Sequence, residues 1–164
     1  MKYIRILWLG TFLILCAYIM INHTQSSGNL SNSYDQSTYL KEDGQGIDFL
    51  DKPWIEVLEK ARNENKFIFL DIYASWCGPC KKLKKTTFAD PQAGEFFNER
   101  FINVAMDAEK GEGKDLANRY KVRSYPTLII FDSAGNVVAT TTGYKNTKQL
   151  IRFASKIEMS EANP

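Results

Sequence analysis

The chain has 164 residues, a net charge of +2 and a composition that is 44% hydrophobic. This length suits one folded domain with a short appendage, and a charge so close to zero gives no reason to expect a nucleic-acid partner. Three cysteines and a single histidine, His23, are too few for a disulfide-stapled scaffold or a structural zinc site. No flavin or nucleotide motif is present in the sequence either, so we expect no metal and no other cofactor.

Residues 1–22 consist of a short basic start and an uncharged apolar run. Lys2 and Arg5 precede sixteen residues without a charged side chain. That length lies between the core of a signal peptide and a full membrane span. The basic residues orient the N-terminus toward the cytoplasm, so that everything downstream is exported. We therefore expect a signal anchor that crosses the membrane through residues 4–21 and holds the protein on the periplasmic side of the cytoplasmic membrane.

Two alternatives for this segment stay open. A signal peptide could be cleaved near Thr24-Gln25-Ser26, which would leave a secreted protein. A lipoprotein could be modified at Cys16, although the bulky Leu15 before it and the apolar residues after it are unlike the usual lipidation site. Under the anchor interpretation, Cys16 is simply a small apolar residue in the span.

The rest of the chain divides by composition. Residues 23–46 are rich in Ser, Asn, Gln, Thr and Gly, have little to bury and are predicted to form a flexible polar linker. Residues 47–158 carry the periodic apolar patterns of a folded domain, and residues 159–164 form a short C-terminal tail.

The first part of the folded domain alternates helices with apolar strands. Apolar residues recur at helical spacing after Asp51, the expected N-cap, and Pro53 in the first turn: Trp54, Val57, Leu58 and Ala61. Residues 67–73 are too continuously apolar for an edge strand and predict a central strand buried on both faces. The next elements are a helix from Cys77, a short helix capped by Asp90 at Pro91, a strand over 101–107, a loop over 110–114 and a short helix over 114–120.

The second part of the domain predicts a hairpin followed by a helix. Residues 128–131 form a buried strand, 132–136 a turn and 137–142 the returning strand. A final helix after Gly143 places Leu150, Phe153, Ala154 and Ile157 on one face. This order predicts an α/β domain whose central mixed β-sheet is flanked by helices on both sides.

The sequence Cys77-Gly78-Pro79-Cys80 follows the central strand directly and opens a helix. A strand that delivers a Cys-x-x-Cys pair to a helix N-terminus is typical of thiol–disulfide chemistry. At that position the unpaired backbone N–H groups and the helix dipole favour a thiolate at Cys77. We hypothesise that Cys77 and Cys80 form a redox-active disulfide, in which Cys77 attacks a substrate disulfide and Cys80 resolves the mixed disulfide.

Asp71 interrupts the otherwise apolar central strand and is expected to lie buried below Cys80. An isolated buried carboxylate has a raised pKa and can then accept and return the proton of the resolving thiol. The alternative is a solvated acid at a strand end. Four lysines on the following helix, Lys81, Lys82, Lys84 and Lys85, are interpreted as a solvated face in preference to a partner-binding patch.

Three features together resemble the thioredoxin family over about residues 47–157: Trp76 before the cysteine pair, Asp71 six residues ahead of Cys77, and Tyr125-Pro126-Thr127 downstream. The chain is most similar to exported, membrane-tethered members. Residues 69–74 and 87–91 also match the thioredoxin-like domain that ends transmembrane thiol:disulfide interchange proteins. Two residues depart from the usual pattern: Tyr73 stands where cytosolic thioredoxins usually carry Trp, and Asn103 where many carry a lysine near the buried acid.

The resemblance implies a thioredoxin fold, here preceded by the N-terminal hydrophobic helix, and a cis peptide bond before Pro126. It also implies that the chain at Tyr125 faces the cysteines and pairs with the substrate backbone. The implied substrate-binding residues are Trp76, Gly78, Pro79, Tyr125 and Pro126. The Gly-Pro between the cysteines resembles the reducing members, which implies a protein-disulfide reductase. Its partners would then be protein disulfide substrates and an upstream thiol electron donor.

Two other functions remain as alternatives. A thioredoxin-fold binding module or holdase would use the same fold without redox turnover, and would need neither Asp71 nor the cysteine pair chemically. A Cu(I) metallochaperone could use the two thiolates as soft ligands, but no Met or His lies beside Cys77 to complete the site.

Overall fold

The computed structural model of the protein describes residues 46–161. The predicted signal anchor, all but the last residue of the predicted linker, and residues 162–164 lie outside the described residues. Within residues 46–161, no helix combines the length and the apolar character that a membrane crossing needs. The elements follow the order α2 (Trp54–Glu64), β1 (Phe67–Tyr73), α3 (Gly78–Thr86), α4 (Pro91–Arg100), β2 (Phe101–Asp107), α5 (Gly111–Arg119), β3 (Thr127–Phe131), β4 (Val137–Thr142) and α6 (Thr147–Glu161).

The four strands form one mixed sheet with the order β2-β1-β3-β4. Strand β1 pairs in parallel with β2 and antiparallel with β3, and β3 pairs antiparallel with β4. The five inner residues of β1 are all buried, so the prediction of a central strand is confirmed. In this register Asp71 lies opposite Ala105 of β2 and Leu128 of β3.

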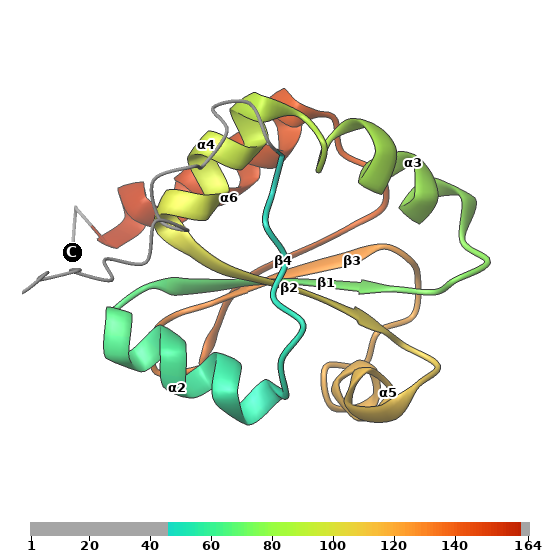
Figure 1. The fold of residues 1–164 in the computed structure, drawn as a ribbon, viewed down its shortest axis with the longest axis horizontal. Coiled ribbons are helices and arrows are strands. Elements are labelled where there is room, and N and C mark those ends of the chain that lie inside the picture. The colour runs from blue at the N-terminus through green and yellow to red at the C-terminus, as the bar shows by residue number, and fades with distance from the viewer. Residues whose placement is uncertain (1–45, 162–164) are drawn as a thin grey trace, which may run out of the picture. The chain divides into compact units, whose positions relative to one another are not determined.

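Helices cover both faces of the sheet, as predicted (Figure 1). Helices α2 and α5 lie on one side, which we call the closed face. Helices α3, α4 and α6 lie on the other side, which we call the open face. Because successive side chains of a strand point to opposite faces, Ile68, Leu70 and Ile72 of β1 point into the closed face. Phe69 joins the apolar cluster of the open face, and Asp71 shares that side of the strand.

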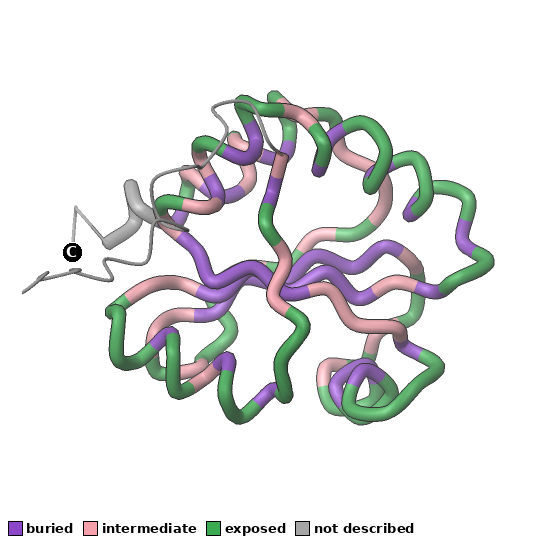
Figure 2. Tube along the Cα trace, viewed as in Figure 1, coloured by how far each residue is buried: buried purple, intermediate pink, exposed green. Residues whose placement is uncertain are grey.

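The buried segments concentrate along the sheet and on the inward sides of the helices, whereas the outer helix surfaces are exposed (Figure 2). The final helix places Leu150, Ala154 and Ile157 in the open-face cluster, with Phe153 packed partly buried against it. Strand β4 is the outer strand on its side of the sheet and has no buried residue.

Of the two helix N-caps predicted from the sequence, the one at Asp90 is confirmed and the one at Asp51 is wrong. Asp90 caps α4 through its side chain, which accepts a hydrogen bond from the Gln92 N–H. Asp51 was wrongly predicted as the cap of α2: the N-cap is Pro53, and the first helical N–H, that of Trp54, donates instead to Glu112 Oε2 of α5 at 2.9 Å. A distant acid therefore replaces the local cap.

The loop predicted over residues 110–114 is also wrong, because α5 already begins at Gly111. The glycines there are not helix breakers. A Cβ on Gly113 would lie 2.2 Å from the carbonyl oxygen of Asp107, so a glycine is required where α5 passes close to the end of β2. The contact allows α5 to pack directly under the strand from which it emerges.

Candidate active site

The cysteine pair lies at the N-terminus of α3, shortly after the end of β1, and is joined by a disulfide. Cys77 is the N-cap residue of α3, and its Sγ accepts a hydrogen bond of 3.1 Å from the Cys80 N–H. Both residues are buried, with 3% of Cys77 and 6% of Cys80 exposed. Because a helix-terminal N–H already points at the Cys77 sulfur, a thiolate formed there on reduction gains a hydrogen bond and the favourable end of the helix dipole.

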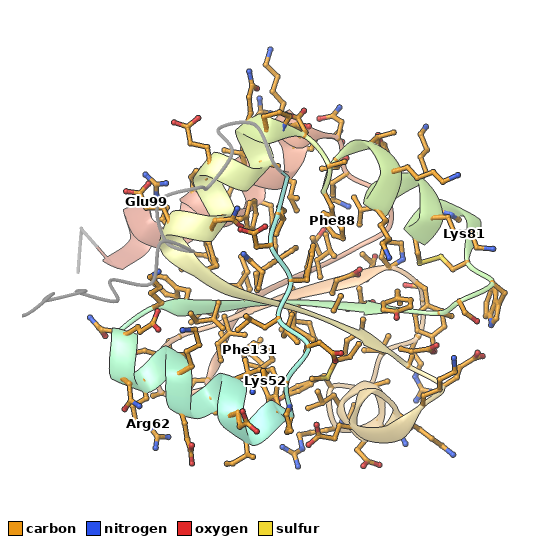
Figure 3. All side chains as sticks on the ribbon, in the orientation of Figure 1. Lys52, Arg62, Lys81, Phe88, Glu99 and Phe131 are labelled. Atoms are coloured by element: carbon orange, nitrogen blue, oxygen red, sulfur yellow. A yellow bond between two sulfur atoms is a disulfide. The ribbon has the colours of Figure 1, made fainter. Side chains whose placement is uncertain are left out.

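The two residues between the cysteines form the first turn of α3. Gly78 and Pro79 are both exposed, and the proline is pre-set for the start of a helix. A Cβ on Gly78 would meet no atom within 4 Å, so the surface above this turn is open. The disulfide lies next to Lys81, which is labelled in Figure 3, at the N-terminal end of α3.

Asp71 is buried in the middle of β1, as expected, with 5% of its surface exposed. Its Oδ1 atom is buried and has no hydrogen-bond partner among the described residues. Burial raises the pKa of the Asp71 carboxyl to about 7, because the charged form is poorly solvated there. A carboxyl with that pKa can both take up and release a proton near neutral pH.

A cavity of about 500 Å³ connects Asp71 and Cys80 with the surface. Phe88, labelled in Figure 3, lines its apolar side, together with Phe49 and Leu50 of the segment that precedes α2. Exposed residues of α3 also line it, namely Lys81 and Lys84. Sequence reasoning did not find this cavity, because its wall is assembled from segments far apart in the chain.

The segment before β3 lies beside the disulfide. The Tyr125–Pro126 peptide bond is cis, which confirms the expectation from the family resemblance. Tyr125 packs against the small cluster of Ala74, Cys77 and Cys80. Pro126 is buried, and its carbonyl oxygen accepts a hydrogen bond from the Gly143 N–H at 2.8 Å, so that the end of β4 supports this segment.

Trp76 is the most exposed large apolar side chain next to the disulfide, with 65% of its surface accessible. Its indole Nε1–H donates to Glu109 Oε1 at 2.9 Å, and its ring meets Tyr125 edge-on with 6.0 Å between ring centroids. The hydrogen bond and the ring contact fix the positions of the two aromatic rings, which together form an apolar surface beside Cys77. Glu109 was not predicted, and no local pattern could have found it, because it lies 33 residues from Trp76.

Asn103 of β2 has its amide nitrogen engaged away from Asp71. Its Nδ2 donates to the carbonyl oxygen of Asp48 at 3.3 Å and to Asn98 Oδ1 at 3.2 Å. The β2 residue opposite Asp71 is Ala105, which carries no charge. Strand β2 therefore brings no cation to the buried acid, in contrast to the family pattern noted above.

Comparison with known proteins agrees with this geometry. A family model described as a thioredoxin-like domain matches residues 55–158. The solution structure of a disulphide isomerase from Bacteroides thetaiotaomicron is 38% identical and superposes with a TM-score of 0.64, covering 71% of this chain and 97% of that one. A thioredoxin from Thermus thermophilus, 19% identical with a TM-score of 0.58, covers 70% of this chain and 87% of its own and shares the fold.

Among curated proteins, the thiol:disulfide interchange protein DsbD of Haemophilus influenzae is 33% identical over 100 residues, which are 59% of this chain and 17% of that protein. DsbD of Tatumella citrea is 31% identical over the same coverage. This chain thus spans about one sixth of the length of these relatives. Together with the Cys77–Cys80 disulfide, they support thiol–disulfide oxidoreductase chemistry. The match over residues 55–158 and the fold agree, and the chain belongs to the family of thioredoxin-like domains.

Proposed function

We propose that the domain reduces disulfide bonds of exported proteins by thiol–disulfide exchange, with Cys77 as nucleophile and Cys80 as resolving thiol. The observation that carries this proposal is the redox pair itself. A disulfide caps the N-terminus of α3 and shares a cavity with a buried carboxyl that has no hydrogen-bond partner in the described part of the chain. A binding module has no chemical use for that combination.

In the first step the reduced Cys77 thiolate attacks one sulfur of the substrate disulfide. A bond forms between Cys77 Sγ and that sulfur, the substrate S–S bond breaks, and the departing substrate sulfur takes a proton from water. The exposed ring of Trp76 and the half-buried ring of Tyr125 offer an apolar surface for the chain around the substrate cysteine. We assign substrate positioning to these rings, to the turn of Gly78 and Pro79, and to the backbone at Tyr125-Pro126.

In the second step Cys80 resolves the mixed disulfide. The Asp71 carboxylate accepts the proton of the Cys80 thiol, and the resulting sulfur attacks Cys77 Sγ. The second substrate sulfur departs and is protonated, which leaves the Cys77–Cys80 disulfide that the structure contains. Two electrons have then passed to the substrate. Asp71 releases its proton through the cavity, which links it to solvent-exposed residues of α3.

A protein with a reduced thiol pair would return the enzyme to its starting state by the same exchange in reverse. The reducing direction is supported by the resemblance of Gly78-Pro79 to the reducing members of the family. Residues 1–22 would hold the domain at the exported side of the membrane and residues 23–46 would let it reach both the donor and its substrates.

Trapping of mixed disulfides tests the assignment of roles. We expect the full-length Cys80→Ser protein to accumulate covalent adducts that dithiothreitol releases, since the mixed disulfide on Cys77 can no longer be resolved. Cys77→Ser is the matched control and should form no such adducts. If Cys80→Ser forms none while its Cys77 still reacts with a maleimide, the assignment is wrong. An unchanged ability of Cys77→Ser to bind client proteins, without any reductase activity in the wild type, would favour the holdase.

The direction is tested separately by the midpoint potential of the pair, measured by equilibration with glutathione buffers. A potential clearly below that of the compartment supports reduction, and one above it supports oxidation. Asp71→Asn should slow the resolving step at neutral pH. The exposed Asp115→Asn serves as its control, because Asp115 carries the same charge but does not line the cavity.

A further inference from the structure

The charged side chains that line the cavity beside Asp71 come from few of the surrounding elements, and the positively charged ones come from a single helix. Strand β2 contributes Ala105, β1 contributes Tyr73 besides Asp71 itself, and the segment before α2 contributes Asp51. The opposite neighbour on β3, Leu128, is apolar. Among the residues that line the cavity, cations therefore come from α3 alone, as Lys81 and Lys84.

Proton transfer from Cys80 requires Asp71 to be ionised, and the negative charge then has little to stabilise it. Its Oδ1 has no hydrogen bond within residues 46–157, and the amide nitrogen of Asn103 is already engaged with Asp48 and Asn98. A carboxylate without donors in a poorly solvated place is strongly disfavoured. A nearby cation that can approach through the cavity would offset this.

Lys84 is the lysine best placed to approach. It follows Cys80 by four residues on α3, so the two lie on the same stripe of the helix. Long helical side chains run back toward the helix N-terminus, which carries the Lys84 stem over the turn that holds Cys80. Lys84 is exposed, and no acidic partner holds its ammonium elsewhere in the described domain. Lys82, by contrast, lies over the ring of Tyr144 at 4.5 Å.

We propose that Lys84 is a positioning residue of the exchange reaction: its ammonium moves over the cavity, stabilises the ionised Asp71 carboxylate and thereby keeps that carboxylate able to accept the Cys80 proton at neutral pH. Among the residues that line the cavity, this counter-charge comes from α3 and not from β2. The inference rests on the proposed function, because it assigns a helper to the proton acceptor proposed there.

Lys81 lines the same cavity but fits this role less well. It follows Cys80 by one residue, which turns its side chain about 100° around the helix from Cys80. Lys85 is the natural control, because it is an exposed lysine on the same helix that does not line the cavity.

The test is the pH dependence of disulfide reduction by the full-length protein, measured between pH 5.5 and 9 for wild type, Lys84→Met, Lys84→Arg and Lys85→Met. Without the cation the carboxylate is less stable, so the acceptor forms only at higher pH. We expect the midpoint of the Asp71-dependent limb to rise by about 0.5 to 1 pH unit in Lys84→Met, with a roughly threefold to tenfold slower rate below the midpoint. Lys84→Arg should restore the wild-type midpoint, and Lys85→Met should leave it unchanged.

Salt provides a second measurement on the same proteins. At about 1 M ionic strength the charge interaction is screened, so the wild-type midpoint should move toward that of Lys84→Met, whereas the midpoint of Lys84→Met should stay nearly constant. Equal midpoints for Lys84→Met and Lys85→Met at low salt would overturn the inference. Asp71→Asn distinguishes a failure of the proposed function from a failure of the role assigned to Lys84. If it abolishes the limb while Lys84→Met does not shift it, the proposed function stands and only the role of Lys84 fails.

Discussion

The two faces of the sheet differ although the same strand supplies both. On the closed face, β1 contributes Ile68, Leu70 and Ile72, all fully buried against α2 and α5. On the open face the alternate residues begin with the fully buried Phe69 but continue with Asp71. Beyond that acid the apolar packing gives way to a cavity of about 500 Å³.

This difference separates stability from chemistry within one strand. From β1 the closed face receives only apolar side chains, and their burial is the main favourable contribution to folding. The open face keeps a buried carboxyl without a hydrogen bond and space beside it, and both features oppose folding. They are useful only because Cys80 shares that space. The comparison predicts opposite effects for substitutions on adjacent residues of β1.

The largest effect is expected for Asp71→Asn. In the unfolded chain this carboxyl ionises near pH 3.9, whereas burial raises its pKa to about 7 in the folded protein. The folded-state pKa is the higher one, so its contribution to stability is complete below about pH 4 and is lost as the pH rises to about 7. This amounts to about 4 kcal/mol.

Urea unfolding from pH 4 to pH 8 would measure it. Asp71→Asn should remove most of this pH dependence, so that the variant becomes more stable relative to wild type as the pH rises. Asp115→Asn should follow the wild-type curve. Identical slopes for Asp71→Asn and wild type would show that the folded protein does not hold this carboxyl in its neutral form.

On the closed face, Leu70→Ala should have an effect of similar size and of the opposite sign. Leu70 is fully buried, so its truncation leaves a cavity and should lower the free energy of unfolding by about 2 to 5 kcal/mol. The midpoint potential of the folded variant should match wild type, because Leu70 points away from Cys80. Val138→Ala, at a 40% exposed position of β4, is the control and should change stability by less than about 0.5 kcal/mol.

Ala105→Val tests whether the open face can be made more like the closed one. Ala105 lines the cavity opposite Asp71, so the added methyl groups should occupy part of the empty space and stabilise the fold by up to about 1 kcal/mol. Reduction of disulfides should become slower, because water reaches the carboxyl less readily. Ala139→Val on β4, at a partly buried position outside the cavity lining, should leave the reaction rate unchanged.

The smallest effect is expected where the two helices of the closed face meet. Glu112 of α5 accepts the first N–H of α2, from Trp54, at 2.9 Å. Glu112→Ala should lower the free energy of unfolding by about 0.5 to 1 kcal/mol, since this N–H loses its partner. Glu112→Gln keeps an oxygen acceptor and should lose less. Equal losses for both variants would show that charge, not the hydrogen bond, links the helices.

Local signals in the sequence were sufficient for most elements and for the centre of the site. The apolar run of residues 67–73 predicted the central strand, and Asp90-Pro91 predicted a helix start, because both depend on neighbouring residues. The cis bond before Pro126 followed from the family resemblance. The start of α5 was missed, since Gly113 serves a close approach to Asp107 that no local pattern reveals.

By itself, then, the sequence determined that a cysteine pair caps a helix after a buried strand that carries one acid, because spacing and hydrophobic periodicity are properties of contiguous residues. The tertiary structure decided what surrounds that pair. Contacts across 33 or 58 residues place Glu109 on Trp76 and Glu112 on Trp54. Packing between the segment before α2, β2 and α3 leaves a cavity that Asp71, Cys80 and Lys84 all line. These groups come together only when the chain folds, so no local sequence pattern predicts their contacts.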